Sequence, residues 1–145
     1  MRQPFLSRRI LEFLSLDENR TNKRYTPVEK PLLNRDLDGV PRKHPWVYSG
    51  AVSMLSYYCN SVRPDIQMAV HQTERFSINP MRSHELAIMR IGRYLRDNTD
   101  GGITYKIDTS KGLEVYADAD FDGAWDKADS DNADNVLSRT GFVIC

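Results

Sequence analysis

The strongest chemical pattern in this sequence is the acidic string YADADFDG at residues 116–123, in which aspartates alternate with other residues. If the string forms a strand, Asp118, Asp120 and Asp122 project from one face, because alternate residues of a strand point the same way. Three carboxylates on one exposed face repel one another unless solvent or a cation relieves them. The string therefore indicates either a metal site that uses Asp118 and Asp120, or a solvated acidic strand end.

The same aspartates also fit a calcium-binding loop of the EF-hand type. Asp118, Asp120 and Asp122 would take loop positions 1, 3 and 5, with Gly123 at position 6 and Asp129 at position 12. Position 12 normally holds a bidentate glutamate, and the preceding segment GLEVY favours a strand. A helix before Asp118 would favour the EF-hand alternative, and a strand would oppose it.

A second candidate site is basic. Arg90, Arg93 and Arg96 fall on one side of a helix expected at residues 81–96, where they form either a phosphate-binding surface or a solvated face. The three histidines are too scattered to indicate a site, and no serine or cysteine has a recognisable base arrangement for nucleophilic catalysis. Nucleic acid is therefore the partner that the basic residues suggest.

The elements that would position these residues are of two kinds, so we expect an α+β chain. Apolar residues at helical spacing predict a short helix within residues 1–14 and three more within residues 46–100. Of these three, the first has Val47 on its apolar stripe, the second runs from Pro64 to Asn79-Pro80, and the third has Ala87, Ile88, Ile91 and Leu95 on its inner face. Because such apolar stripes need partners, we expect the isolated chain to dissolve poorly. Residues 15–45 contain Pro27, Pro31, Pro41 and Pro45 and read as an extended connector that lies along a surface outside this chain. Residues 101–145 change to a strand-like pattern, with strands expected at GITYKI, LEVYADADF and RTGFVIC and a loop at residues 122–137.

Charge and composition limit the function further. The 145 residues have a net charge of zero, but residues 1–100 hold 16 Lys/Arg against 11 Asp/Glu, and residues 101–145 hold 4 against 9. A basic part joined to an acidic part suggests two units with different partners. Two cysteines cannot form a disulfide framework, and no stretch is apolar enough for a membrane span or a secretory leader. We therefore expect an intracellular location, cytoplasmic or nuclear, with no membrane partner.

Several strings, taken in order, resemble the polyprotein of copia-type LTR retrotransposons, at the place where the reverse transcriptase ends and RNase H begins. The matching pieces are Arg63-Pro64-Asp65-Ile66, Ala69-Val70, Arg75-Phe76, Pro80, His84, Arg90, Arg93-Tyr94-Leu95, Asp118-Ala119-Asp120 and Ser138 to Phe142. The segment QPFLSRRILEFLSL and Thr26-Pro27 resemble the stretch that follows the polymerase palm. The resemblance covers nearly the whole chain and lies in the order and spacing of many short pieces.

The resemblance implies a specific organisation. Residues 1–14 would end the reverse transcriptase, residues 15–45 would be a connector, and residues 46–100 would be a thumb- or connection-like helical segment. Residues 101–145 would be the truncated start of an RNase H-like domain. That enzyme cuts the RNA strand of an RNA–DNA hybrid with two Mg²⁺ ions held by four carboxylates, and Asp118 matches the first of them. The expected location would then include a cytoplasmic virus-like particle.

Two departures limit the expected activity. The polymerase box Tyr-X-Asp-Asp is absent, because Ala119 separates Asp118 from Asp120, and the other RNase H carboxylates would lie beyond Cys145. Phe121 also stands where the family usually has tryptophan. We therefore expect a catalytically incompetent segment that binds RNA–DNA hybrid or duplex weakly and holds no Mg²⁺ tightly. The alternatives are the EF-hand module and a host protein that reuses the helices for binding.

Overall fold

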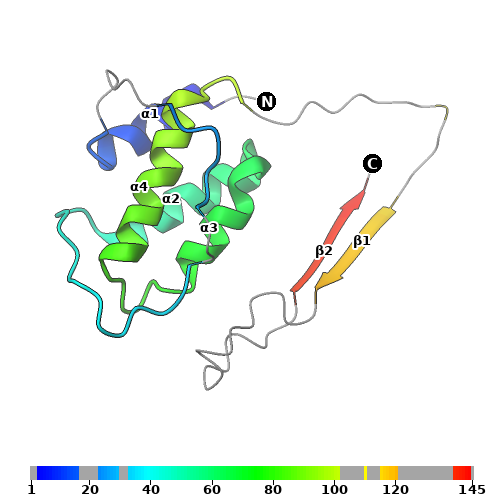
Figure 1. Cartoon of the computed structure of the whole chain (residues 1–145). Helices are drawn as coiled ribbons and strands as arrows, with labels where there is room; N and C mark the ends of the chain where they lie inside the picture. The colour runs from blue at the N-terminus through cyan, green and yellow to red at the C-terminus, as the bar shows by residue number, and fades with distance from the viewer. Residues whose placement is uncertain are drawn as a thin grey trace. The chain divides into compact units, whose positions relative to one another are not determined.

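The computed structural model describes residues 3–16, 23–29, 33–101, 110, 115–120 and 139–144. The chain divides into two compact units, Met1–Ile103 and Thr104–Cys145. The described part of the first unit is helical, and that of the second contains a two-stranded sheet (Figure 1).

The first unit is built from four α-helices and one short 3-10 helix. They are α1 (Pro4–Phe13), α2 (Tyr48–Ser61), η1 (Pro64–Ile66), α3 (Gln67–Glu74) and α4 (Arg82–Asp97). These elements lie where the periodic apolar residues predicted helices, which confirms the helical part of the α+β prediction. None of the helices in the described ranges is both long and apolar enough to cross a membrane.

One helix boundary differs from the sequence prediction. The run that begins at Pro64 was expected to continue to Asn79-Pro80, but α3 ends at Glu74. The Ser77 hydroxyl donates a hydrogen bond to the Glu74 carbonyl at 2.8 Å, and the Ser77 N–H donates to the same oxygen at 3.1 Å. Serine competes with the helix for backbone groups in this way, so the chain turns before the proline.

The core lies where α4 packs against α1, α2 and α3 (Figure 1). On α4 the buried apolar residues Ile88, Ile91 and Leu95 recur at helical spacing, as the sequence predicted. Ala87, which was expected on the same inner face, is only half-buried. The remaining core comes from the other elements, with Ile10, Leu14, Leu55, Ile66 and Val70 among the most deeply buried side chains.

The turn that follows α1 packs closely against Gly92 of α4. Ser15 adopts φ 53°, and the Leu16 N–H donates to the Leu11 carbonyl at 2.9 Å, which is the hydrogen bond of a Schellman motif. This turn sends Leu14 and Leu16 onto Gly92, where an added Cβ would lie 2.7 and 2.5 Å from their Cδ1 atoms. A side chain at position 92 would therefore force the ends of both leucine side chains to move.

A buried arginine joins the start of η1 to the end of α4. Arg63 is 2% exposed, and its guanidinium donates two hydrogen bonds to Asp65, at 2.8 and 2.7 Å, and one to the Asn98 carbonyl at 2.8 Å. The Tyr94 hydroxyl donates to the same Asp65 carboxylate at 3.0 Å. Burial on its own would raise the pKa of Asp65, but the hydrogen bonds and charge of Arg63 outweigh it and lower that pKa.

The second unit contains β1 (Val115–Asp120) and β2 (Arg139–Ile144), which pair antiparallel. The register places Val115 opposite Ile144 and Asp120 opposite Arg139. Strands were predicted in both places, but two paired strands do not by themselves identify an RNase H-like domain. The expected strand GITYKI and the expected loop at residues 122–137 lie outside the described residues.

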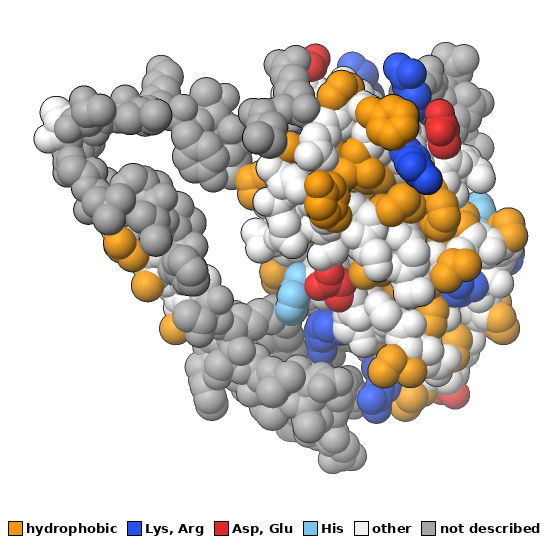
Figure 2. All heavy atoms as spheres, turned by 180° about the vertical axis from the view of Figure 1, so that it is seen from behind, with side chains coloured by type: hydrophobic (Ala, Val, Ile, Leu, Met, Phe, Trp, Pro, Cys, Tyr) orange, Lys and Arg blue, Asp and Glu red, His pale blue; other side chains and the backbone are white. Residues whose placement is uncertain are grey.

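Some apolar side chains of the helical unit face the solvent. Phe5 is 76% exposed, Val47 63% and Tyr57 61%, although Val47 was expected on the inner stripe of α2. Figure 2 shows hydrophobic side chains gathered on one face, with Lys and Arg side chains among them. Exposed apolar side chains that gather on one face are typical of surfaces that another protein covers. The expectation that the isolated chain dissolves poorly therefore stays a prediction.

Replacing Asp65 with asparagine tests the buried pair. Asp65→Asn leaves the guanidinium of Arg63 buried without its countercharge, so we expect the unfolding free energy at neutral pH to fall by about 2 kcal/mol. The difference in unfolding free energy between the wild type and Asp65→Asn should shrink as the pH falls from the ordinary aspartate pKa of 3.8 through the lowered pKa of the folded protein. Protonation of the wild-type carboxylate then removes the stabilisation that the variant already lacks.

Urea denaturation at neutral and acid pH measures both effects. The control is Asp38→Asn, which changes an exposed carboxylate in the connector and should alter stability by less than about 0.5 kcal/mol. An equal effect of the two substitutions would contradict the role given to Asp65.

Candidate functional site

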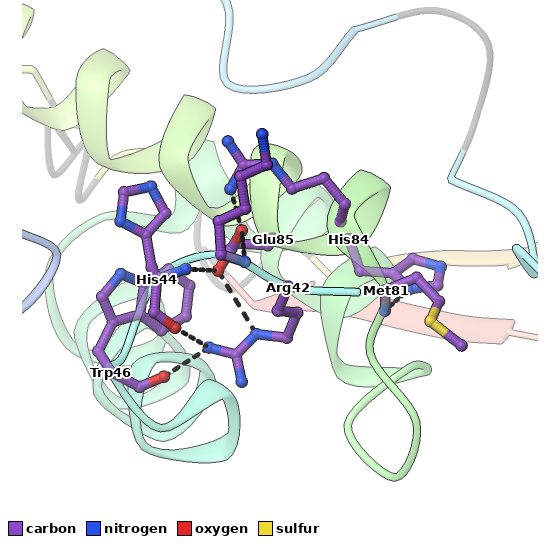
Figure 3. Close-up of polar contacts among 8 residues, drawn as sticks. Arg42, His44, Trp46, Met81, His84 and Glu85 are labelled. Carbon is purple, nitrogen blue, oxygen red and sulfur yellow. Dashed lines mark hydrogen bonds and ion pairs between the residues drawn. The ribbon is translucent and has the colours of Figure 1, made fainter. Parts of the chain in front are cut away.

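The most elaborate polar site surrounds Glu85, in the first turn of α4 (Figure 3). The Glu85 side chain is 0% exposed. Its two carboxylate oxygens accept hydrogen bonds from the backbone N–H groups of His44 at 2.8 Å and Lys43 at 3.1 Å. Arg82 donates to the same carboxylate, and the Arg42 Nε lies 3.6 Å from it. One side chain of α4 thus holds the end of the connector.

The environment keeps Glu85 ionised. Burial on its own would raise its pKa, but the hydrogen bonds from Lys43 and His44 and the charge of Arg82 outweigh burial and lower the pKa. The stability that Glu85 contributes is therefore present at neutral pH, and it is lost as the pH falls through the lowered value.

Arg42 completes this site from the connector side. Its guanidinium carbon lies 4.8 Å from the ring centre of Trp46 and 5.5 Å from that of Tyr48, within the range of cation–π contacts. The same guanidinium donates to the Trp46 and His44 carbonyls (Figure 3). The indole and the guanidinium therefore fix the course of the chain into α2.

His84, one residue before Glu85, binds a second part of the connector. Its ring is 1% exposed, its Nδ1 accepts a hydrogen bond from the Met81 N–H at 2.8 Å, and its Nε2 lies 3.0 Å from the Asn34 carbonyl. These two contacts require the neutral tautomer with the proton on Nε2. The Phe76 ring stacks on it at 4.1 Å. His84 is therefore a structural residue that forms hydrogen bonds within the protein. This agrees with the sequence, in which the scattered histidines indicate no site.

The earlier part of the connector follows the same helix. Asp97 accepts from the Arg24 N–H at 2.7 Å, and the Asn98 amide donates to the Arg24 carbonyl at 2.9 Å. Arg90 contacts Glu29 and Thr26. The prediction that residues 15–45 lie along a surface outside the chain is wrong for the described ranges 23–29 and 33–45. They pack on α4 because its polar face pairs with their backbone groups.

The predicted basic surface has partners within its own unit. Arg90 forms an ion pair with Glu29, and Arg96 forms one with Asp97 at 2.8 Å. The Arg96 and Asp97 side chains are 6% and 7% exposed, whereas Glu29 is 72% exposed. Arg93 is partly buried on the same helix. Nucleic-acid binding by these arginines stays a prediction, and a phosphate would have to compete with the two carboxylates.

The acidic string lies on β1. Asp118 is exposed, and its cross-strand partner is Gly141, which has no side chain. Residues opposite each other in an antiparallel pair share a face, and no atom of the described residues would lie within 4 Å of a Cβ added at Gly141. Asp120 lies two residues on along the strand, as predicted, and Asp122 lies outside the described residues.

The EF-hand alternative has no support in the described residues. Asp118 and Asp120 belong to a strand that begins at Val115, whereas an EF-hand loop follows a helix. Within the described ranges no group of three or more His, Cys, Asp or Glu side chains is placed to hold a metal ion. Metal binding by Asp118 and Asp120 therefore stays a prediction, and one exposed carboxylate would need further ligands.

Glu85 was missed by the sequence analysis, although a signal was present. Position 85 precedes Ile88 by three residues and so falls on the apolar face of the predicted helix. A carboxylate on an apolar face is either paired or functional, because an unpaired buried charge is too costly. The position of Glu85 on the apolar face is thus a sequence signal for a carboxylate paired with a buried donor.

The chain is similar in sequence to Pol polyproteins of plant transposons. It is 33% identical over 138 residues to the "Retrovirus-related Pol polyprotein from transposon RE1" of Arabidopsis thaliana. The aligned residues cover 94% of this chain and 9% of that protein. It is 36% identical over 97 residues to the "Retrovirus-related Pol polyprotein from transposon TNT 1-94" of Nicotiana tabacum. Here the aligned residues cover 67% of this chain and 7% of that protein. The predicted resemblance to copia-type polyproteins is therefore confirmed, and the chain spans under a tenth of their length.

A relative with a different name matches a shorter stretch. The chain is 32% identical over 76 residues to "Secreted RxLR effector protein 161" of Plasmopara viticola, which covers 52% of this chain and 54% of that protein. No family model matches the chain. No solved structure matches it either.

Replacing Glu85 with glutamine tests its hold on the connector. In Glu85→Gln one carboxylate oxygen becomes an NH₂ group, which faces a backbone N–H donor and leaves it unpaired. We expect a loss of about 3 kcal/mol in unfolding free energy and faster cleavage by trypsin after Arg42 and Lys43.

The matched control is Glu12→Gln, an exposed glutamate of α1, which should leave both the melting temperature and the cleavage pattern unchanged. Wild-type resistance to trypsin in Glu85→Gln would show that the connector does not depend on this carboxylate.

Proposed function

We propose, from the premise that the chain is related to the Pol polyproteins of copia-type LTR retrotransposons, that it contains the end of a reverse transcriptase and the start of RNase H. The helical unit would be the thumb- or connection-like part, which holds a template–primer duplex. The paired strands would open the nuclease domain. The parent reactions would be RNA-dependent DNA synthesis and cleavage of the RNA strand of a hybrid.

The observation that carries the proposal is the position of Asp118. Its carboxylate is exposed on a paired strand, and the residue opposite is glycine, so the cross-strand neighbour carries no side chain that would compete with a cation for it. This is how the first metal ligand of a two-metal nuclease must be presented. Asp120, two residues further along the same strand, is the second predicted ligand.

The nuclease site would be incomplete in this chain. Mg²⁺ requires near-octahedral oxygen coordination and gives up its waters reluctantly. Two-metal hydrolysis also needs two ions held about 3.5–4 Å apart. One exposed carboxylate meets neither requirement, so the chain would act only as part of a larger assembly that supplies the other ligands. Within that assembly its location would be a cytoplasmic virus-like particle or the nucleus.

A second candidate function is a binding module in a host protein that reuses the helices. It is favoured by the relative from Plasmopara viticola, which this chain covers over half of its length. The self-contained core of α1 to α4 supports this candidate, because these helices pack without the paired strands.

The nucleic-acid prediction follows from the two arginine pairs. Glu29 is exposed and can be displaced from Arg90, whereas the Arg96–Asp97 pair is buried. We therefore expect Glu29→Gln to strengthen binding to an RNA–DNA hybrid by freeing Arg90. In Arg90→Gln the slope of log affinity against log salt should fall by about 0.9, the value for one lost phosphate contact.

Fluorescence anisotropy with a labelled hybrid across a salt series measures these effects. Glu12→Gln removes an exposed negative charge elsewhere and should strengthen binding less than Glu29→Gln. Affinity that does not change with salt, or equal gains in the two variants, would overturn the prediction.

The metal prediction concerns Asp118. We expect calorimetry to give a dissociation constant for Mg²⁺ on the order of 10⁻³ M or weaker, and no cleavage of hybrid by the purified chain. Asp118→Asn should weaken even this binding. Cleavage of hybrid by the chain alone would contradict the proposed incompleteness of the site, and Ca²⁺ binding lost in Asp118→Asn would contradict the nuclease assignment.

A further inference from the structure

A groove of about 1080 Å³ lies between α3, α4 and the connector. Five residues of α4 line it at helical spacing, Ser83, Leu86, Ala87, Arg90 and Ile91, and α3 contributes Ala69, Gln72 and Thr73. Pro27, Val28 and Leu33 are among the connector residues that line it. The groove therefore runs along both helices, and its volume is at the upper end of the range for ligand sites.

The groove offers apolar contacts at its mouth as well as in its interior. Leu86 is 45% exposed and Val28 is 43% exposed, and they come from different elements. Ile91 and Ala69 are buried beneath. A ligand that enters between Leu86 and Val28 would cover apolar surface that otherwise faces water.

Two hydrogen-bond donors in its lining lack partners. Gln72 is 3% exposed, and its Nε2 has no hydrogen-bond partner among the described residues, while its Oε1 accepts from Arg75 at 3.3 Å. The Arg90 Nε is likewise without a partner, because the contacts of that guanidinium with Glu29 and Thr26 use the other two nitrogens. Both nitrogens are shielded from water, so each unpaired N–H destabilises the free protein. Both side chains belong to the lining of the groove, so a ligand bound there could accept from these N–H groups.

The charges around the groove cancel. Arg90 is paired with Glu29, and Asp36 accepts a hydrogen bond from Ser83 at 2.6 Å. The fourth charged residue among the described lining residues is Arg35, so two acidic and two basic residues line the described part of the groove. An uncharged ligand suits this lining better than a phosphate or a free carboxylate.

We propose that this groove binds an uncharged, extended apolar peptide segment whose backbone carbonyls accept from Gln72 and Arg90. An extended chain has carbonyls to offer, whereas those of a helix are used within the helix. Ser83 and Ile91 are eight residues apart on α4, or about 12 Å at ~1.5 Å per residue. That length matches about four residues of extended chain at ~3.3 Å each. The inference goes beyond the proposed function, since no nucleic acid takes part.

The test uses the full chain labelled with ¹⁵N and an N-acetylated, C-amidated tetrapeptide in which leucine and serine alternate. Titration should shift the Gln72 side-chain amide resonances and the backbone amides of Leu86 and Ala87 in a saturable way. A blocked tetraserine peptide should produce no saturable shift. Absence of saturable shifts with the leucine–serine peptide would overturn the proposal.

Variants separate the groove from the rest of the surface. Leu86→Asp should weaken binding at least tenfold, because it places a charge at the mouth. Met68→Asp changes an equally exposed residue of α3 outside the groove, 49% exposed, and should bind within about twofold of the wild type. Equal losses in these two variants would overturn the proposal.

Gln72→Leu tests the donor. It removes an unpaired buried N–H, which offsets the loss of the 3.3 Å hydrogen bond from Arg75, so the melting temperature should change little. Peptide affinity should nevertheless drop roughly fivefold with the lost hydrogen bond to the ligand. Wild-type affinity in Gln72→Leu would overturn the proposal.

Discussion

A carboxylate with no access to water must find all its partners inside the protein, and except for Arg82 Glu85 finds them in a segment more than forty residues earlier. Two backbone N–H groups and two arginines surround it, which is close to the full hydrogen-bonding capacity of its oxygens. Because the N–H groups belong to adjacent residues, Lys43 and His44, the contact fixes the position and the direction of the chain at once. The path into α2 follows from that constraint.

The rest of the connector continues the arrangement along α4. His84 binds the carbonyl of Asn34, Arg90 binds Glu29, and Asp97 binds the N–H of Arg24. The polar face of α4 is therefore occupied by its own chain, while its apolar face forms the core. Two functional properties follow from this arrangement. The arginines that suggested a phosphate site are partly neutralised, and a groove remains where the connector and the helices do not meet.

The helices could be predicted from the sequence because their signal is local. Ile88, Ile91 and Leu95 recur at helical spacing whatever the rest of the chain does, and the alternation around Asp118 likewise predicted a strand face. The connector could not be predicted in the same way. Its contacts join backbone groups to polar side chains across long separations, such as Arg90 to Glu29 over 61 residues, and such contacts leave no periodic pattern. Proline content alone suggested a segment without partners, and that was the main error.

The central claim is that Glu85 makes residues 42–44 part of the cooperative core and not a surface loop. Native-state hydrogen exchange of the Lys43 and His44 amides tests it most directly, because these N–H groups donate to the carboxylate. The account predicts that both amides exchange as slowly as the α4 amides around Ile88, with the same free energy of opening. Exchange of Lys43 and His44 at the rate of an exposed loop, while Ile88 stays protected, would contradict it.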